Sequence, residues 1–246
     1  MSDGLAFTPL YRFTNGVGGT TIIEALEIEG WFVDPEEDEP DEFVIFGRMV
    51  NPEGLSDESP GNVVMDVLDA TGGDMGGYDI GSMVVSRVES SDIPGVDRIG
   101  GTFFGHTAPF AGAGLFYRRL ATGVPVRSGE WMEYPGEWHR SWLHTVQKRW
   151  SGGGRSGDWP VCVMDGRRIV GEASFYCAIG EAVSGPGKYF GSNLNALDDC
   201  LMMSVHGVPF ELVWTDFAAS ARRIDPFEVE IAIDILIEYD ITVTLR

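Results

Sequence analysis

Two neighbouring carboxylates follow a glycine turn in residues 189–201, which read Tyr-Phe-Gly-Ser-Asn-Leu-Asn-Ala-Leu-Asp-Asp-Cys-Leu. Gly191 suits a tight turn, and Ser192 or Asn193 suits the cap of a helix that follows it. The apolar positions of this helix would form one buried stripe, made of Leu194, Leu197 and Leu201. The opposite face would carry Asn195, Asp198, Asp199 and Met202. Such a face presents two negative charges to a partner, although an ordinary solvated helix face explains the same residues.

The whole chain is strongly acidic. Its 246 residues include 38 acidic and 17 basic side chains, which give a formal net charge of −21. Nucleic-acid binding depends on cations that displace condensed counterions, so this balance disfavours direct binding to DNA or RNA. It also disfavours docking on anionic lipid. A cationic partner would instead be attracted from a distance.

No pattern in the chain predicts an enzyme, a cofactor or a metal site. The glycine-rich stretches 16–20 and 72–81 lack the Lys-Ser/Thr ending of a phosphate-binding loop, so hairpin turns are expected there. His139 and His144 are wrongly spaced for two metal ligands on one helical face. The three cysteines are widely spaced, which predicts buried, reduced thiols at Cys162, Cys177 and Cys200.

The N-terminus resembles no signal peptide. Residues 1–4 are acidic, and no basic segment followed by an apolar run is present. No stretch approaches the roughly 20 apolar residues that span a bilayer. We therefore expect a soluble, cytoplasmic protein that does not bind membranes.

A glycine-rich segment at residues 151–158 predicts a flexible linker between two domains. Residues 1–150 are expected to form a mainly β, acidic domain whose role the sequence leaves open. Strand-like apolar stretches between Gly- or Pro-containing turns occur here at residues 43–50, 62–68, 82–88 and 114–120. The domain is expected to end in a helix over 138–150, because Trp142, Val146 and Trp150 are spaced to share one face.

Residues 159–246 predict alternating strands and helices. Strands are expected at residues 159–164, 209–214 and 241–245, and helices at residues 173–183, 192–203 and 216–223. Residues 227–238 alternate at period two, as in a strand, but Asp225-Pro226 is a good helix start. With a helix there, the order β-α-α-β-α-α-β predicts a small three-stranded parallel sheet packed with helices.

The segment 189–201 closely resembles the barstar family of ribonuclease inhibitors. It matches the family pattern of two aromatics, Gly, any residue, Asn-Leu, any residue, Ala-Leu, any residue and Asp-Cys-Leu. The likeness extends to residues 163–166, 209–217 and 240–243, and it spans about residues 159–246. It implies a barstar-like α/β domain and favours a helix over 227–238. Nothing before the linker takes part in it.

The resemblance implies an inhibitor, immunity protein or antitoxin that blocks the cationic active site of a barnase-like secreted ribonuclease or ribonuclease toxin domain. The helix and the loop before it would occupy positions meant for RNA phosphates, without any cofactor. Asp199 matches the family's principal aspartate, and Tyr189 matches an aromatic that packs over the catalytic histidine. Gly191 and Asn193 match loop contacts. The remaining candidate contacts are Asn195, Asp198, Met202, Asp234 and Glu238.

Two positions depart from the family pattern. Asn195 replaces an aspartate, and Asp198 replaces a common aromatic. A related ribonuclease with a different rim is therefore a better candidate partner than barnase itself. These changes also permit an adaptor that has lost ribonuclease binding. A third interpretation places a binding or enzymatic activity in the N-terminal domain, and a pocket with His106 or His139 beside carboxylates would favour it.

Overall fold

The structure, a computed structural model, describes residues 7–16, 18–33, 42–54, 62–104, 110–123, 127–150, 160–203 and 210–246. The chain forms two compact units, Met1–Val124 and Pro125–Arg246. Among the described residues, no helix is both long enough and apolar enough to cross a bilayer.

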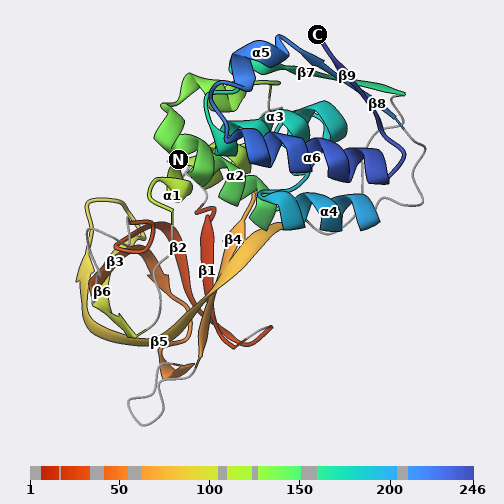
Figure 1. Cartoon of the computed structure of the whole chain (residues 1–246). Helices are drawn as coiled ribbons and strands as arrows, with labels where there is room; N and C mark the ends of the chain where they lie inside the picture. Colours follow the sequence, from red (N-terminus) through yellow and green to blue (C-terminus); the bar gives the residue numbers. More distant parts are fainter. Residues whose placement is uncertain are drawn as a thin grey trace. The chain divides into compact units, whose positions relative to one another are not determined.

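The N-terminal unit is a closed barrel of six antiparallel strands (Figure 1). The strands are β1 (Tyr11–Asn15), β2 (Thr21–Glu29), β3 (Glu42–Met49), β4 (Val63–Leu68), β5 (Asp74–Ser90) and β6 (Asp97–Phe104). Their order around the barrel is β1-β2-β3-β6-β5-β4. Period-two alternation directs every second side chain inward, and Phe13, Ile23 and Met65 are fully buried as a result. This arrangement confirms the mainly β character expected for this part of the chain.

One expected strand of this unit is wrong. Residues 114–120 lie in helix α1 (Ala113–Ala121), whose buried positions include Ala113, Phe116, Tyr117 and Leu120. That spacing of three and four residues is the signature of a helix face, and it outweighs the strand-like composition. The hydroxyl oxygens of Tyr117 and Tyr78 are 2.7 Å apart in a buried hydrogen bond, which ties α1 to β5.

The C-terminal unit contains the expected three-stranded parallel sheet, in the order β7-β8-β9. Its strands are β7 (Val161–Asp165), β8 (Glu211–Thr215) and β9 (Thr242–Leu245), and its helices include α3 (Glu172–Ser184), α4 (Leu194–Met203), α5 (Phe217–Ser220) and α6 (Pro226–Glu238). Helix α3 packs against β7, and α6 packs against β9 (Figure 1). The order of elements is therefore β-α-α-β-α-α-β, as the sequence predicts.

Helix α6 settles the ambiguous segment 227–238. The Asp225 carboxylate accepts a hydrogen bond from the Phe227 backbone N–H at 2.9 Å, and Pro226 occupies the first turn. This cap satisfies a donor that a helix start leaves without a partner, and the fixed φ of proline suits the same position. Val229, Ala232 and Leu236 form the buried face. The local start signal therefore overrides the period-two alternation.

The C-terminal unit begins before the predicted linker. It includes the short helices η2 (Glu130–Glu133) and η3 (Gly136–Trp138) and the helix α2 (His139–Lys148), which packs on α3. The sequence-based boundary assigned these residues to the N-terminal domain. The predicted linker 151–158 lies outside the described residues.

Candidate functional site

The turn that leads into α4 depends on Gly191. This residue has φ of 99°, in the region that favours glycine, and a Cβ atom there would lie 2.8 Å from the Leu197 Cα. The backbone of the turn therefore packs directly on the buried side of the helix. The requirement for glycine at this position comes from the domain itself, and contact of Gly191 with a partner stays a prediction.

Asn193 caps α4. Its side-chain Oδ1 accepts a hydrogen bond from the Ala196 backbone N–H at 2.8 Å, and its carbonyl oxygen accepts one from the Leu197 N–H at 2.9 Å. An asparagine cap of this kind contributes about 1 kcal/mol to helix stability. It fixes the first turn of the helix and, with it, the direction of the side chains that follow.

Helix α4 separates apolar and polar residues largely as the sequence predicts. Leu197, Cys200 and Leu201 are buried, whereas Leu194 is half-buried. Asn195, Asp198, Asp199 and Met202 are all exposed, and 56% of the Met202 surface is accessible. The structure therefore brings these four predicted site residues together on one face. We call this set the α4 acidic face.

Asp198 is held by a residue that the sequence analysis did not single out. The Tyr239 hydroxyl, which follows the end of α6, donates a 2.8 Å hydrogen bond to Asp198 Oδ1. The bond to this carboxylate raises the pKa of Tyr239, because loss of the phenolic proton would place two negative charges together. Tyr239 thus joins α6 to the α4 acidic face. The pair is separated by 41 residues in sequence, so local patterns carry no signal for it.

Asp199 differs from its neighbour. Its carboxylate is exposed, and within the described part of the chain it makes no hydrogen bond or ion pair. An exposed carboxylate on a capped helix is available to a cationic group of a partner. This arrangement suits the role that the family pattern implies for Asp199.

Two further predicted residues lie on α6. Asp234 and Glu238 are exposed, on the side of the helix away from its buried face. Helix α6 packs against α4. Both carboxylates are therefore on the helix next to the α4 acidic face, although no described bond links them to Asp199.

Tyr189 lies inside the structure. Only 4% of its surface is exposed, and its hydroxyl donates a 3.1 Å hydrogen bond to the Ser192 Oγ. The ring of Trp150 packs on it, with 5.4 Å between ring centroids. Burial raises the pKa of Tyr189. The predicted contact of this ring with a partner's histidine is thus limited by groups that already cover it.

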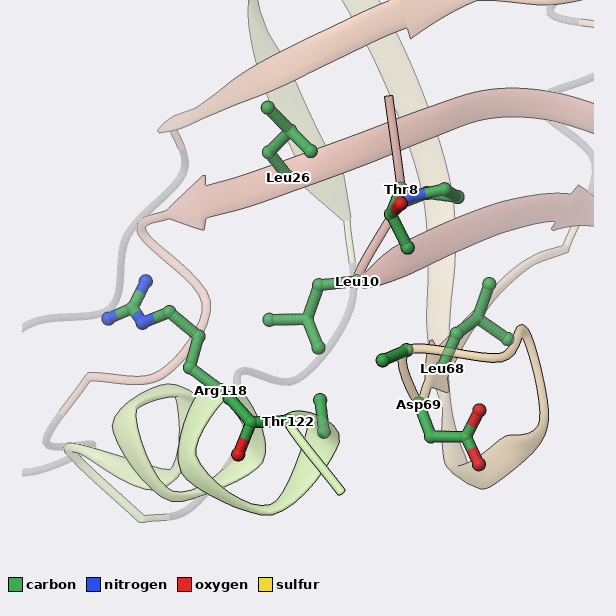
Figure 2. A pocket seen from close by; sticks show the side chains of 10 residues that line it. Thr8, Leu10, Leu26, Leu68, Asp69, Arg118 and Thr122 are labelled. Atoms are coloured by element: carbon green, nitrogen blue, oxygen red, sulfur yellow. The ribbon is translucent and has the colours of Figure 1, made fainter. Parts of the chain in front are cut away.

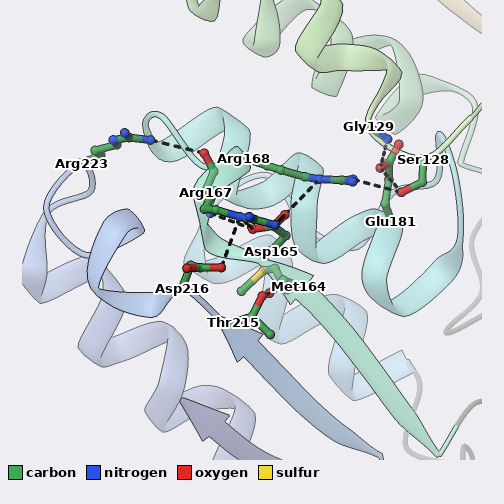
Figure 3. A network of polar contacts seen from close by, with 10 residues as sticks. All are labelled: Ser128, Gly129, Met164, Asp165, Arg167, Arg168, Glu181, Thr215, Asp216 and Arg223. Carbon is green, nitrogen blue, oxygen red and sulfur yellow. Dashed lines mark hydrogen bonds and ion pairs between the residues drawn. The ribbon is translucent and has the colours of Figure 1, made fainter. Parts of the chain in front are cut away.

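A separate group of charged residues joins the ends of β7 and β8 (Figure 3). Arg167 contacts Asp165 at 2.9 Å and Asp216 at 3.2 Å. The hydrogen bond from Arg167 lowers the pKa of Asp165. Since its cation and carboxylates are paired with one another here, the group stabilises a turn.

The described residues also include a pocket in the N-terminal unit (Figure 2). It has a volume of about 230 Å³, and its apolar lining includes Leu10, Leu26 and Leu68. Arg118 lies at its edge and forms an ion pair with Glu27. Among the described residues that line this pocket there is no histidine.

The histidines and cysteines form no described metal site. Among the described residues, no group of three or more His, Cys, Asp or Glu side chains could hold a metal ion. His139 is buried with Nε2 at 3.1 Å from the Tyr134 carbonyl oxygen, and burial lowers its pKa. His106 lies outside the described residues. Cys162, Cys177 and Cys200 are buried and reduced.

The comparisons with known proteins concern the C-terminal unit. Residues 159–244 match the family model described as Barstar (barnase inhibitor). No curated protein matches the chain. The chain therefore carries a barstar-like domain at its C-terminal end, in the segment that contains the α4 acidic face.

Proposed function

We propose that the barstar-like domain binds a barnase-like microbial ribonuclease and blocks its active site with the α4 acidic face and the loop before it. The observation that carries this proposal is the exposed pair of carboxylates, Asp198 and Asp199, on a capped helix of this domain. The match of residues 159–244 to the barnase-inhibitor family supports it.

The chemistry of a ribonuclease explains why carboxylates would bind there. An enzyme that cleaves RNA must gather cationic side chains to hold the phosphates and to stabilise the charge that develops on them. Carboxylates on a rigid helix can pair with the same cations in charge-assisted hydrogen bonds. Asp199 is the principal contact, because its carboxylate has no bonding partner among the described residues.

The remaining residues of the face set which ribonuclease binds. Asn195 has an amide where the family pattern has a carboxylate. The exposed Asp198 carboxylate accepts a hydrogen bond from Tyr239 before any partner binds. These differences favour a related secreted ribonuclease, or a ribonuclease toxin domain, over barnase. The protein would act as an immunity protein in the cytoplasm, without a cofactor and without direct contact with nucleic acid. The net charge of −21 would speed its encounter with a cationic enzyme.

The test is a titration of the purified full-length chain into a panel of small microbial ribonucleases, with RNA cleavage as the readout. We expect stoichiometric loss of activity for at least one cationic member. The Asp199→Ala chain should need a much higher concentration for the same effect, whereas Asp92→Ala, which removes an exposed carboxylate from the N-terminal unit, should not. If every ribonuclease keeps its full activity, the proposal is wrong.

A further inference from the structure

The barstar-like domain is larger than the family match. The match covers residues 159–244, but the compact unit begins at Pro125. The added residues bring their own core: Trp131 and Trp142 are 0% and 1% exposed. Helix α2 packs on α3, and the Cys177 Sγ lies 3.7 Å from the His139 carbonyl oxygen. The segment is therefore part of the folded domain.

A half-buried carboxylate fixes the start of this segment. Glu181 of α3 accepts hydrogen bonds from the Gly129 N–H at 2.6 Å and from the Ser128 hydroxyl at 3.2 Å (Figure 3). It also accepts one from the Gly187 N–H at 3.2 Å, in the turn after α3. Charge-assisted bonds to backbone donors are among the stronger ones in proteins. The added segment is thus anchored at its first turn.

The end of the segment reaches the loop that precedes α4. Trp150 follows α2, is half-buried, and packs on Tyr189 with 5.4 Å between ring centroids. Tyr189 has little exposed surface: Trp150 is one of the groups packed on its ring, and its hydroxyl is bonded to Ser192. Trp150, a residue outside the family match, therefore contributes a partly exposed aromatic ring beside this loop.

We propose that Trp150 is a partner-contacting residue of the inhibitor surface and presents its indole where the family pattern places the ring of Tyr189. This inference rests on the proposed function. Tryptophan is enriched among residues that dominate interface energetics, and its ring attracts cationic side chains. A ribonuclease active site that meets Asp199 would present such cations, or a catalytic imidazole, to the neighbouring indole. The added segment thus contributes directly to recognition of the ribonuclease.

Substitutions at two tryptophans of the full-length chain test this inference. Trp138 is the matched control, since it is also half-buried but precedes α2, whereas Trp150 follows it. For a ribonuclease that the wild-type chain inhibits, we expect Trp150→Ala to raise the inhibition constant at least about tenfold. Trp150→Phe should retain part of the affinity, and Trp138→Ala should retain all of it. Thermal unfolding of each variant verifies that the chain is folded at the assay temperature.

A second readout needs no ribonuclease. If Trp150 covers Tyr189, its removal should lower the pKa of the Tyr189 phenol, measured as the difference in alkaline ultraviolet titration between Trp150→Ala and the same variant with Tyr189→Phe. Trp138→Ala should leave this pKa unchanged. An unchanged Tyr189 titration in Trp150→Ala would contradict the covering role on which the inference depends.

The outcomes separate the two proposals. If the wild-type chain inhibits a ribonuclease and Trp150→Ala inhibits equally well, the role of Trp150 is wrong and the proposed function stands. Equal weakening by Trp150→Ala and Trp138→Ala would show a general effect on α2 and would also overturn it. If the wild-type chain inhibits no ribonuclease, the proposed function fails and the inference fails with it.

Discussion

The Tyr239 hydroxyl donates a 2.8 Å hydrogen bond to the Asp198 carboxylate, and this bond links the end of α6 to the exposed face of α4. The two side chains come from elements that are far apart in sequence and adjacent in the fold. The bond restricts the orientation of one of the two carboxylates on the α4 acidic face. Asp199, the next residue, has no such restraint from the described part of the chain.

The effect of Asp198 on the pKa of Tyr239 can be checked by titration. Asp198→Asn removes the negative charge but keeps an oxygen acceptor, so we expect the pKa of Tyr239 to fall toward the ordinary value for tyrosine. The reason is that the carboxylate, as bond acceptor and as a charge, disfavours the phenolate. Difference titration against Tyr239→Phe measures this pKa. An unchanged pKa in Asp198→Asn would mean that the bond does not form in solution.

Because His144 has a lowered pKa, we expect the stability of the chain to depend on pH. Burial, followed by the charge of Lys148, lowers its pKa from 6.5 to about 4. In the unfolded chain, His144 therefore binds a proton near pH 6.5, whereas in the folded chain it binds one only near pH 4. The stability linked to neutral His144 is complete well above pH 6.5 and is lost as the pH falls to 4, by at most about 3–4 kcal/mol in the free energy of unfolding.

The matched variant for this prediction is His144→Gln. Urea unfolding at several pH values between 7 and 4 should show a steeper loss of stability for the wild-type chain than for the variant. The comparison isolates His144 from two other groups. The lowered pKa of His139 acts in the same direction, whereas the raised pKa of half-buried Glu181 acts in the opposite one. Parallel pH profiles for the two proteins would show that His144 titrates normally.

Gly191 should tolerate no side chain. Gly191→Ala places a Cβ atom 2.8 Å from the Leu197 Cα at a φ of 99°, and we expect a loss of roughly 1–3 kcal/mol in the free energy of unfolding. Gly136→Ala is the control, because among the described residues a Cβ atom there meets only the Val170 Cγ2, at 3.7 Å. Urea unfolding measures both. Equal stabilities for the two variants would contradict the close packing of the turn on α4.

The boundary of the C-terminal unit predicts the outcome of truncation. A chain of residues 125–246 keeps Trp131, Trp142 and the bonds of Glu181, and we expect it to fold and to inhibit as the full chain does. A chain of residues 157–246 loses both tryptophans and the Glu181 bonds from Ser128 and Gly129, and it uncovers the face of α3 that α2 packs on. We expect it to unfold at a much lower temperature in circular dichroism. Equal thermal stability of the two fragments would show that the added segment is dispensable.

The order of elements in the C-terminal unit could be predicted because each start and stop has a local signal. Asp225-Pro226 marks the start of α6, and Gly191 with Asn193 marks the start of α4. The two faces of α4 followed from the helical period alone. In the N-terminal unit, strand-like composition was a weaker guide, and it produced the wrong assignment for α1. Strands β1, β2 and β6 were not identified, although β1 and β2 are neighbours in the chain and pair with each other.

The parts of the site that could not be predicted all depend on contacts between distant residues. The bond of Tyr239 to Asp198 and the packing of Trp150 on Tyr189 each join separate elements. No periodicity or motif encodes such contacts, because they arise only when the helices are packed. The family pattern implies that Tyr189 contacts the partner, whereas here Trp150, a residue from outside the pattern, packs on its ring.

The central claim is that Asp199 neutralises a cationic ribonuclease site, and one comparison tests it most directly. For a ribonuclease that the full-length chain inhibits, the inhibition constant of Asp199→Ala is measured against those of the wild-type chain and Asp92→Ala. We predict a loss of about 2–5 kcal/mol of binding free energy for Asp199→Ala, because the cations of the enzyme are left buried without a partner. Asp92→Ala should bind like the wild type. Equal inhibition by all three proteins would contradict the account.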